Sequence, residues 1–315
     1  MTPLVTIILP NYNHASYLRN RIENVLNQTY QNFELIILDD CSSDNSVDII
    51  NEYRGHPKIK SIILNTKNSG STFKQWMTGF DLASDFVWIA ESDDVNDMDF
   101  LKTCMRVIIE NNSDIVFANS HMIDSEGKII GDLNWWFQQF SKYDYSRDFT
   151  VDSKEYIKNA LSFNNSIMNA SSVVFKLNKN IDISSITNFK LCGDWFFWIS
   201  HLSFSSKISY VADKLNYYRF HNNSVRAITD KSTIVLYEAM KVRTFCIQKF
   251  SLSKEYKKNI VKEVVINFKS VIVNLFNQSL YLKIIAVLYN MFRINTFLTI
   301  RVIIKLLNNK ICNVN

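Results

Sequence analysis

Short apolar runs alternate with amphipathic segments along the first 120 residues of the chain. Five runs rich in β-branched residues have the length of buried strands, and they span residues 5–9, 33–38, 59–64, 86–90 and 115–118. Helical patterns lie between the first four runs, at residues 16–28, 43–53 and 72–83. This alternation predicts an α/β fold with a mainly parallel, Rossmann-like sheet flanked by helices. Ligands bind at the carboxyl ends of the strands in such sheets.

The pattern changes after residue 120. We predict a hairpin at 122–130, an aromatic stretch at 135–137, a helix at 153–161, a strand at 171–175, a helix from Gly193 and a strand pair ending at Phe220. From Ser232 onward the chain follows helical spacing. The sequence therefore predicts one domain over residues 1–230, with halves 1–120 and 121–230, and a helical extension over 231–315.

The charge distribution separates the two predicted parts more clearly than any linker does. The chain is 47% hydrophobic and has six Gly and three Pro in 315 residues, so it can bury a large core but shows no flexible linker. Residues 1–231 carry 22 Lys and Arg against 27 Asp and Glu, whereas 232–315 carry 13 against 3. The resulting charges of −5 and +10 give the +5 of the whole chain. A cationic extension favours an anionic partner, either phospholipid headgroups or nucleic acid.

Residues 280–308 are predicted to lie on a membrane surface. In a helix, five polar or cationic positions of this segment fall within about 40° of one line. They are Lys283, Asn290, Arg301, Lys305 and Asn308, and the helix can break near Asn295. Charges interrupt every apolar stretch before the ~18 residues that a spanning helix needs. The alternative is that the helices of the extension pack on the rest of the chain or form a dimer interface.

The cysteines and the N-terminus favour a cytoplasmic protein. The five cysteines are widely separated and include no C-x-x-C pair, which fits a reducing compartment. The chain runs from Met1 directly into a predicted strand, without the pattern of a signal peptide. Together with the amphipathic extension, these features predict a peripheral position on the inner face of the cell membrane.

Acidic residues gather where the predicted strands end. Glu91, Asp93 and Asp94 follow the fourth strand, and Asp39 and Asp40 follow the second. Clustered carboxylates repel one another unless a cation joins them, and oxygen ligands suit Mg²⁺ or Mn²⁺, which neutralises a diphosphate leaving group. The alternatives for the cluster after the fourth strand are a solvated acidic loop and the cap of a helix N-terminus before Met98. For Asp40, the alternative is turn or cap chemistry.

Further positions carry candidate chemistry. Tyr12 can stack on a nucleobase, and the Asp39 carboxylate can accept a hydrogen bond from an N–H group of that nucleobase. Asp194 precedes an aromatic helix, where desolvation favours a general base that acts on an alcohol, although a helix cap is the alternative. Arg219 and His221 point to one face of the last predicted strand and can meet a phosphate or a metal.

Taken in order along the chain, these motifs resemble the family 2 glycosyltransferases, inverting enzymes of the GT-A fold that bind a nucleoside-diphosphate sugar and a divalent metal. The resemblance spans about residues 4–228. Six motifs carry it: V-T-I-I-L-P-N-Y-N (5–13), L-N-Q-T-Y-Q-N-F-E-L-I-I-L-D-D-C-S-S-D (26–44), N-S-G (68–70), E-S-D-D (91–94), G-D-W (193–195) and Y-Y-R-F-H-N-N-S (217–224).

The resemblance implies a role for each matching residue. The implied nucleotide contacts in residues 1–120 are Pro10, Tyr12, Asn13, Asp39, Asp40, Asn68, Gly70 and Asp93. The implied ligands of Mn²⁺ or Mg²⁺ are Asp93, Asp94 and His221, with Asp94 the more direct one. In residues 121–230, Asp194 is the implied catalytic base. Candidate contacts to the donor or its phosphates are Glu91, Lys74 and Arg219. Apart from the resemblance, the aromatic rings of Trp135, Trp136 and Trp195 are candidate contacts to the acceptor, and the alternative for the stretch at 135–137 is a packed lid.

The resemblance also implies the reaction. A sugar moves, with inversion, from a UDP-hexose or UDP-N-acetylhexosamine to the hydroxyl of a saccharide acceptor, which we expect to be a lipid-linked glycan in bacterial surface-polysaccharide synthesis. No nucleic-acid partner is expected on this interpretation. The alternatives are a membrane-surface or nucleic-acid binding module carried by the basic extension, and another sugar-nucleotide processing enzyme. The latter usually has a Gly-rich phosphate loop, and residues 10–14 do not form one.

The sequence departs from the common family pattern in three places. Glu91 stands where Asp is frequent, and Gly193 stands where Glu often precedes the base. One additional residue between Asn68 and Gly79 leaves open whether Lys74 or Gln75 faces the donor.

Overall fold

The computed structural model describes residues 2–140, 142–179, 181, 184–221 and 231–252, and the single positions 254, 258 and 289. The chain forms two compact units. The first contains Met1–Leu161, Asn165–Phe189 and Gly193–Asn222, and the second contains Ser162–Asn164, Lys190–Cys192 and Asn223–Asn315. The predicted boundary at residue 230 lies outside the described residues, as does the predicted membrane-surface segment apart from Tyr289.

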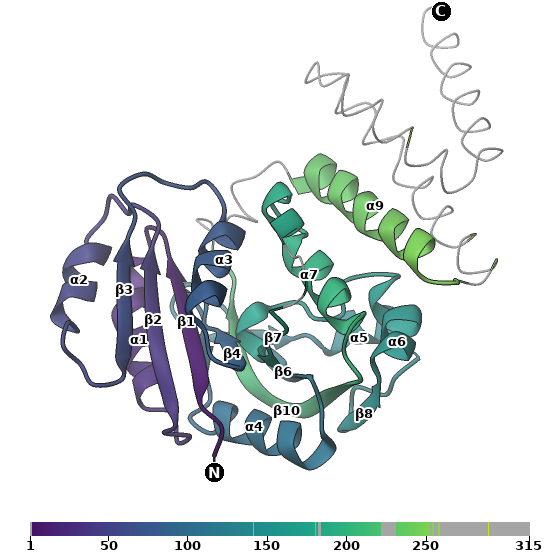
Figure 1. The fold of residues 1–315 in the computed structure, drawn as a ribbon, viewed down its shortest axis with the longest axis horizontal. Helices are drawn as coiled ribbons and strands as arrows, with labels where there is room; N and C mark the ends of the chain where they lie inside the picture. Colours follow the sequence, from purple (N-terminus) through teal and green to yellow (C-terminus); the bar gives the residue numbers. More distant parts are fainter. Residues whose placement is uncertain are drawn as a thin grey trace, which may run out of the picture. The chain divides into compact units, whose positions relative to one another are not determined.

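A ten-stranded sheet forms the centre of the first unit (Figure 1). Its strands are β1 (Val5–Asn11), β2 (Phe33–Asp39), β3 (Ile59–Leu64), β4 (Phe86–Ile89), β5 (Val95–Asn96), β6 (Ile115–Ile123), β7 (Ile129–Asp132), β8 (Phe149–Asp152), β9 (Val173–Lys176) and β10 (Lys207–Arg219). Their order is β3-β2-β1-β4-β9-β6-β10-β5, with β7 beside β6 and β8 beside β10. Strands β3, β2, β1 and β4 are parallel, whereas β9, β7, β8 and β5 pair antiparallel with their neighbours. The α/β prediction is confirmed, and the parallel character belongs mainly to the N-terminal half.

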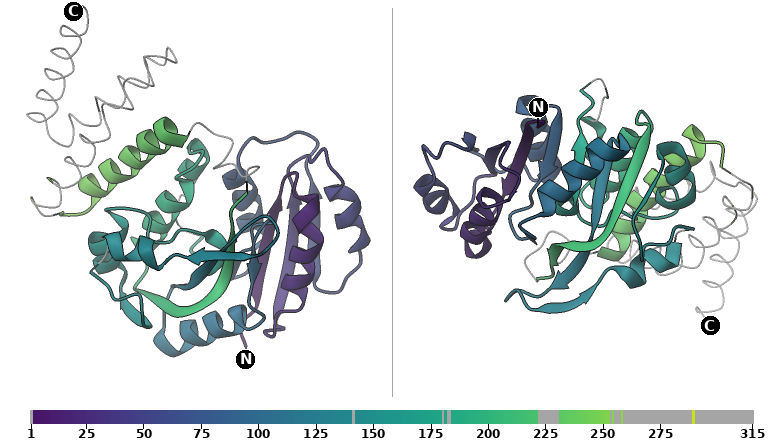
Figure 2. Two further views of the ribbon diagram at one scale, coloured as in Figure 1. Left: turned by 180° about the vertical axis from the view of Figure 1, so that it is seen from behind. Right: turned by 90° about the horizontal axis from the view of Figure 1, so that it is seen from below.

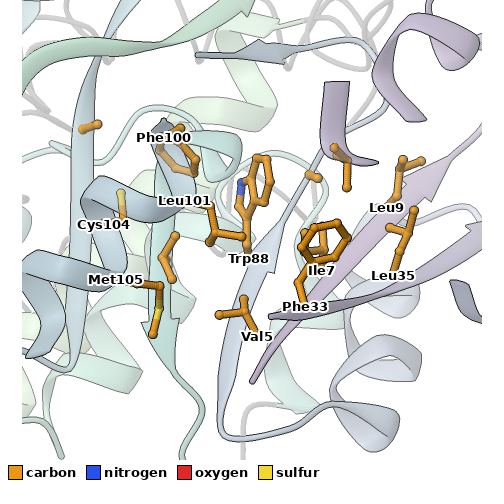
Figure 3. Close-up of a cluster of buried hydrophobic side chains, with 14 of the residues drawn as sticks. Val5, Ile7, Leu9, Phe33, Leu35, Trp88, Phe100, Leu101, Cys104 and Met105 are labelled. Atoms are coloured by element: carbon orange, nitrogen blue, oxygen red, sulfur yellow. The ribbon is translucent and has the colours of Figure 1, made fainter. Parts of the chain in front are cut away.

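Helices cover both faces of the sheet, as predicted (Figures 1 and 2). The α-helices of the first unit are α1 (Ala15–Leu26), α2 (Ser46–Glu52), α3 (Thr72–Leu82), α4 (Phe100–Asn111), α5 (Asn134–Phe140), α6 (Ser153–Tyr156) and α7 (Gly193–Leu202). The main core joins α1, α2 and α4 to one face of β1, β2 and β4. Figure 3 shows Trp88 of β4 at its centre, between Val5 and Ile7 of β1 and the side chains of α4.

Aromatic residues pack the opposite face, where α3 meets α7. Trp76 and Phe80 of α3 lie 6.0 Å and 5.4 Å, between ring centroids, from Phe197 of α7. Helix α3 approaches β1 closely because Gly79 lacks a side chain. A Cβ at Gly79 would lie 2.6 Å from Ile8, well inside van der Waals contact. The alternation of Ile7 and Ile8 along β1 thus anchors helices on both faces.

Two predicted elements differ from the structure. The strand pair expected before Phe220 is the single strand β10, whose register against β6 shifts twice between Val211 and Asn216. This bending lets β10 pair with β8 near its start and with β5 near its end. The predicted helix at 153–161 begins as α6 and continues as a π-helical turn over Ile157–Leu161. The sequence prediction also missed α4, which follows the acidic loop.

The second unit contains helix α9 (Lys231–Lys249) and two short loop segments. The buried Glu238 carboxylate of α9 accepts hydrogen bonds from the backbone N–H groups of Lys190, Leu191 and Cys192 at 2.8–2.9 Å. Arg243 Nε donates to the Phe163 carbonyl oxygen at 2.9 Å. These bonds make α9 and both segments one unit. No helix in the described part of the chain is long and apolar enough to cross a membrane.

Candidate active site

The loops after β1 and β2 are tied together through Asp39. Asn11 and Asp39 are neighbours in the parallel register of these strands. The Asp39 carboxylate accepts hydrogen bonds from Asn11 Nδ2 at 2.7 Å and from the N–H and hydroxyl of Ser42 at 2.8 and 2.6 Å. It has no exposed surface. Beside it Tyr12 is 47% exposed, so its ring is available to a ligand at this edge.

Asp40 holds the turn that precedes α3. Its carboxylate accepts hydrogen bonds from Asn65 Nδ2, from the N–H and hydroxyl of Ser69, and from Gln75 Nε2, all at 2.8–2.9 Å. Its side chain is 5% exposed, so it faces the protein and not a nucleotide, in contrast to our expectation.

The turn itself contains the N-S-G motif. Asn68 Nδ2 donates to the Asp40 carbonyl oxygen, and Asn68 Oδ1 accepts from the N–H of Gly70, whose φ of +72° favours glycine. Gln75 is buried against Asp40, whereas Lys74 is exposed and donates to the Ser69 carbonyl oxygen. Of the two residues that the sequence left open, only Lys74 can therefore reach a ligand.

Asp94 fastens the acidic loop to two other elements. Its Oδ2 accepts hydrogen bonds from Asn169 Nδ2 at 2.8 Å and from the Ser171 hydroxyl at 2.7 Å, and its Oδ1 accepts from the Arg219 N–H at 2.9 Å. The side chain is 2% exposed. This differs from the expectation that Asp94 is the more direct metal ligand, because protein donors already surround its carboxylate.

Asp93 points instead toward two histidines. Its Oδ2 lies 2.9 Å from His221 Nε2, and the His221 ring lies 5.4 Å from that of His14, between centroids. One nitrogen or oxygen atom from each of the three residues lies within 4.8 Å of the others. The hydrogen bond from Arg219 Nε to the Asp93 carbonyl oxygen, at 2.6 Å, fixes the loop against β10. This cluster brings together the ends of β1, β4 and β10.

The three acids of the loop differ in their electrostatics. Burial, followed by the charge of Asp93, raises the pKa of Glu91 to about 8, although a hydrogen bond from Trp76 Nε1 at 2.9 Å opposes this. Burial and Asp93 also raise the pKa of Asp94 to about 6. Burial would raise the pKa of Asp93 too, but the hydrogen bond from His221 and the charge of His14 outweigh it and lower the value. Negative charge therefore concentrates on Asp93.

Asp194 lies in the first turn of α7, where the helix dipole favours an anion. Its Oδ2 accepts a hydrogen bond from Asn165 Nδ2 at 3.0 Å, and its Oδ1 accepts from the Trp195 N–H at 2.7 Å. The Asn165 carbonyl oxygen accepts from Trp136 Nε1 at 2.9 Å. The candidate base is thus linked through Asn165 to the aromatic stretch at 135–137.

The three tryptophans proposed to contact the acceptor have different surroundings. Trp135 is 50% exposed and meets Trp136 edge to face, with ring centroids 5.6 Å apart. Trp195 is 2% exposed, and its Nε1 donates to the Leu161 carbonyl oxygen at 2.7 Å. The ring of Trp195 therefore packs in the interior, and only Trp135 and Trp136 remain candidates for stacking on a sugar.

Gly193 is tightly packed against Phe73 of α3. A Cβ at Gly193 would lie 2.5 Å from Phe73 Cε2. We expect Gly193→Ala to lower the free energy of unfolding by about 1–3 kcal/mol because the overpacked ring must shift. Gly131→Ala is the control, since its Cβ would meet only Met122 Sδ at 3.9 Å. Urea unfolding of both variants measures the difference, and equal stabilities would contradict this packing. The family's frequent Glu does not fit here without a rearrangement.

Sequence reasoning missed His14, Asn165, Asn169 and Ser171. His14 directly follows the first-strand motif, so a metal-binding residue type at the end of β1 was a usable signal. The other three lie in the region after residue 160, where the hydrophobic pattern is weak. Their proximity to Asp94 and Asp194 comes from the tertiary fold.

The fold and these clustered residues define an α/β protein with a candidate ligand site at the carboxyl ends of its parallel strands. Residues 6–168 match the family model of glycosyl transferase family 2, more than half of the 315 residues. The chain therefore belongs to glycosyl transferase family 2 and is a glycosyltransferase, as the motifs predicted. This membership sets aside both alternative functions, a binding module and another class of sugar-nucleotide enzyme.

Similar proteins agree with this assignment. The chain is 27% identical to the glycosyltransferase GlyG of Streptococcus pneumoniae serotype 4, over 71% of this chain and 73% of GlyG. It is 31% identical to the poly(ribitol-phosphate) β-N-acetylglucosaminyltransferase TarP of Staphylococcus aureus, over 40% of this chain and 39% of TarP. The chain thus spans well under half of TarP. The crystal structure of S. aureus TarS 1–349 with UDP-GlcNAc has a similar fold, with a TM-score of 0.68 and 18% identity over 94% of this chain and 83% of that one.

Proposed function

We propose that this enzyme transfers N-acetylglucosamine, with inversion, from UDP-N-acetylglucosamine to a hydroxyl of a saccharide acceptor. The observation that carries the proposal is the cluster of His14, Asp93 and His221 at the carboxyl ends of β1, β4 and β10. In a family whose donors are nucleotide sugars, such a cluster suits a cation that binds a diphosphate. The UDP-GlcNAc bound to TarS and the activity in the name of TarP support this choice of donor.

The cluster fits a divalent transition metal. Two imidazoles and one carboxylate suit Mn²⁺ better than Mg²⁺, which prefers oxygen ligands. Among the described residues, the buried His221 Nδ1 has no hydrogen-bond partner, so no hydrogen bond at this atom competes with a metal. A bound cation would replace the hydrogen bond between His221 and Asp93, and it would neutralise the charge of the leaving diphosphate.

Residues of the β1 and β2 loops would hold the nucleotide. The exposed Tyr12 ring stacks on the uracil, and the bonds of Asp39 to Asn11 and Ser42 keep the two loops at a fixed spacing. Lys74 reaches toward the phosphates from α3. These roles make Asp39 and Asp40 supports of the donor site, with the ring of Tyr12 as its surface.

Asp194 would act as the general base. Its carboxylate accepts the proton of the acceptor hydroxyl while the hydroxyl oxygen attacks the anomeric carbon from the face opposite the diphosphate. The bond from the anomeric carbon to the phosphate oxygen breaks, and UDP leaves with the bonding electrons. Asn165 holds the Asp194 carboxylate in position for this transfer. An α-linked donor then gives a β-linked product, as the name of TarP states for that enzyme.

The acceptor is a saccharide of a surface polysaccharide in this proposal. Trp135 and Trp136 provide the aromatic surface on which such an acceptor stacks, next to the Asn165 that holds the base. Attachment of residues 280–308 to the inner face of the membrane would bring a lipid-linked acceptor within reach.

Calorimetric titration of the full chain with UDP, GDP and UDP-N-acetylglucosamine, in Mn²⁺ or in EDTA, tests the donor site. We expect UDP and UDP-N-acetylglucosamine to bind only with Mn²⁺, GDP to bind more weakly, and Mg²⁺ to replace Mn²⁺ poorly. In the absence of acceptor, slow hydrolysis of UDP-N-acetylglucosamine should release N-acetylglucosamine. Chromatography of the released sugar tests whether this donor is a substrate. Binding of GDP in preference to UDP would refute the proposed donor. Nucleotide binding that is equally strong in Mn²⁺ and in EDTA would refute the proposed metal site.

A further inference from the structure

Arg21 of α1 is a completely buried cation behind the acidic loop. It has no exposed surface, and its guanidinium carbon lies 5.2 Å from the ring centroid of Trp88. Its Nη1 donates to Asn96 Oδ1 at 2.8 Å and to Asn24 Oδ1 at 3.1 Å. Its Nε and Nη2 have no hydrogen-bond partner among the described residues. A buried arginine is costly unless negative charge nearby compensates it, and neither Asn24 nor Asn96 is charged.

A continuous chain of buried amides leads from Arg21 to Asp94. Asn96 Nδ2 donates to Asn216 Oδ1 at 3.1 Å, Asn216 Nδ2 donates to Asn169 Oδ1 at 3.2 Å, and Asn169 Nδ2 donates to Asp94 Oδ2 at 2.8 Å. Each of these residues is at most 7% exposed. Because every amide donates in the same direction, the bonds polarise one another from the cation toward the carboxylate. The chain joins α1, β5, β10 and the loop before β9.

The two ends of this chain are electrostatically complementary. Burial lowers the pKa of Arg21 to about 10, and the charges of Asp94, Asp93 and Glu91 raise it, in that order of effect. The Asp94 carboxylate at the other end binds the Arg219 N–H, two residues before His221. A shift of Asp94 would therefore displace the acidic loop relative to the end of β10. Such a displacement would change the distance from Asp93 to His221.

We propose that Arg21 is a positioning residue of the metal site: through the amides of Asn96, Asn216 and Asn169 it holds the Asp94 carboxylate that aligns Asp93 with His221. Arg21 touches neither the metal nor the substrate. The inference rests on the proposed metal site and adds to it a buried counter-charge in a helix on the opposite side of the acidic loop.

Titration of the full-length protein with Mn²⁺ alone tests the proposal. We expect Arg21→Met to raise the dissociation constant for Mn²⁺ by about tenfold, as loss of an outer partner of a metal ligand does. Arg21→Lys, which keeps the charge, should recover part of the affinity. Asn216→Ser keeps Arg21 but removes the central amide, and it should weaken Mn²⁺ binding to a similar extent. This variant tests the proposal if Arg21→Met does not fold. The double variant should bind Mn²⁺ no more weakly than the single variant with the lower affinity, because both substitutions act through the same series of hydrogen bonds.

Hydrogen exchange of the Arg219 N–H gives a second readout that needs no metal, since this group donates to Asp94. Its protection should fall in Arg21→Met and stay unchanged in Ser209→Ala, a control that removes only the buried hydroxyl bonded to Ser113 and Thr150. If wild type binds Mn²⁺ and Arg21→Met binds it equally well with full protection of Arg219, Arg21 only stabilises the fold and the proposal is wrong. If wild type binds no Mn²⁺, the proposed metal site fails, and loss or retention of Arg219 protection alone then decides whether Arg21 positions Asp94.

Discussion

Asp194→Asn is expected to lower kcat for sugar transfer by about 10³-fold, within the range that a positioned general base contributes. The affinity for UDP in Mn²⁺ should not change. The amide oxygen of the variant can keep the hydrogen bond from the Trp195 N–H, whereas Asn165 Nδ2 then faces the new NH₂ group, so the rearrangement should be confined to Asn165. The amide cannot take a proton from the acceptor hydroxyl. Steady-state rates with saturating donor, together with calorimetry of UDP binding, separate these effects.

The alternative for Asp194 is a purely structural role at the start of α7, and the same substitution distinguishes it. Asn is as good a helix N-cap as Asp, so a residue that only caps the helix should tolerate the change. Asp152→Asn provides the comparison, because Asp152 caps α6 by accepting a hydrogen bond from the Glu155 N–H at 2.9 Å. We expect Asp152→Asn to retain full activity. If Asp194→Asn also retained activity, the base would have to be another residue.

The edge of the sheet where the site lies was predictable from the sequence. Apolar runs define where β1, β2 and β4 end, and the carboxyl ends of parallel strands meet at one edge. The register that places Asn11 beside Asp39 follows from this arrangement. The motifs after these strands therefore had to come together, whatever the rest of the chain does.

The individual roles of neighbouring carboxylates were not predictable in the same way. Asp93 and Asp94 are adjacent in sequence, and their side chains diverge because Asn169, Ser171 and the Arg219 N–H surround one of them. These donors are 75 to 125 positions away along the chain. Local pattern contains no information on contacts at such separations.

Arg21 is another residue whose surroundings were not predictable from the sequence. It is fully buried against Trp88, on the same face of α1 as Leu18, Ile22 and Val25, but the helical pattern does not show which groups surround its charge. Only the strand β5, which is two residues long, brings Asn96 to it. A strand of that length gives no hydrophobic signal.

Asp93→Asn is expected to abolish detectable Mn²⁺ binding, a larger loss than the about 10- to 100-fold that an outer partner of a metal ligand contributes. It should change the free energy of unfolding little, because it loses the attraction to His221 and His14 that lowers the pKa of Asp93 but also removes a negative charge next to Asp94 and Glu91. Donor binding in Mn²⁺ should be lost with it. Calorimetry with Mn²⁺ and thermal unfolding provide both measurements.

Asp94→Asn is the matched variant one position along the chain. For this variant the structure predicts a larger loss of stability and a smaller loss of Mn²⁺ affinity. The new amide N–H₂ would face the donors of Asn169 and Ser171, so the free energy of unfolding should fall by about 1–3 kcal/mol. Mn²⁺ binding should weaken less than in Asp93→Asn, since Asp94 acts on the metal site only through the loop it holds. If Asp94→Asn lost Mn²⁺ with unchanged stability while Asp93→Asn still bound it, Asp94 would be the ligand, as the family resemblance implied. Retained Mn²⁺ affinity in His14→Gln, with loss in Asp93→Asn and His221→Gln, would limit the metal site to the latter two residues.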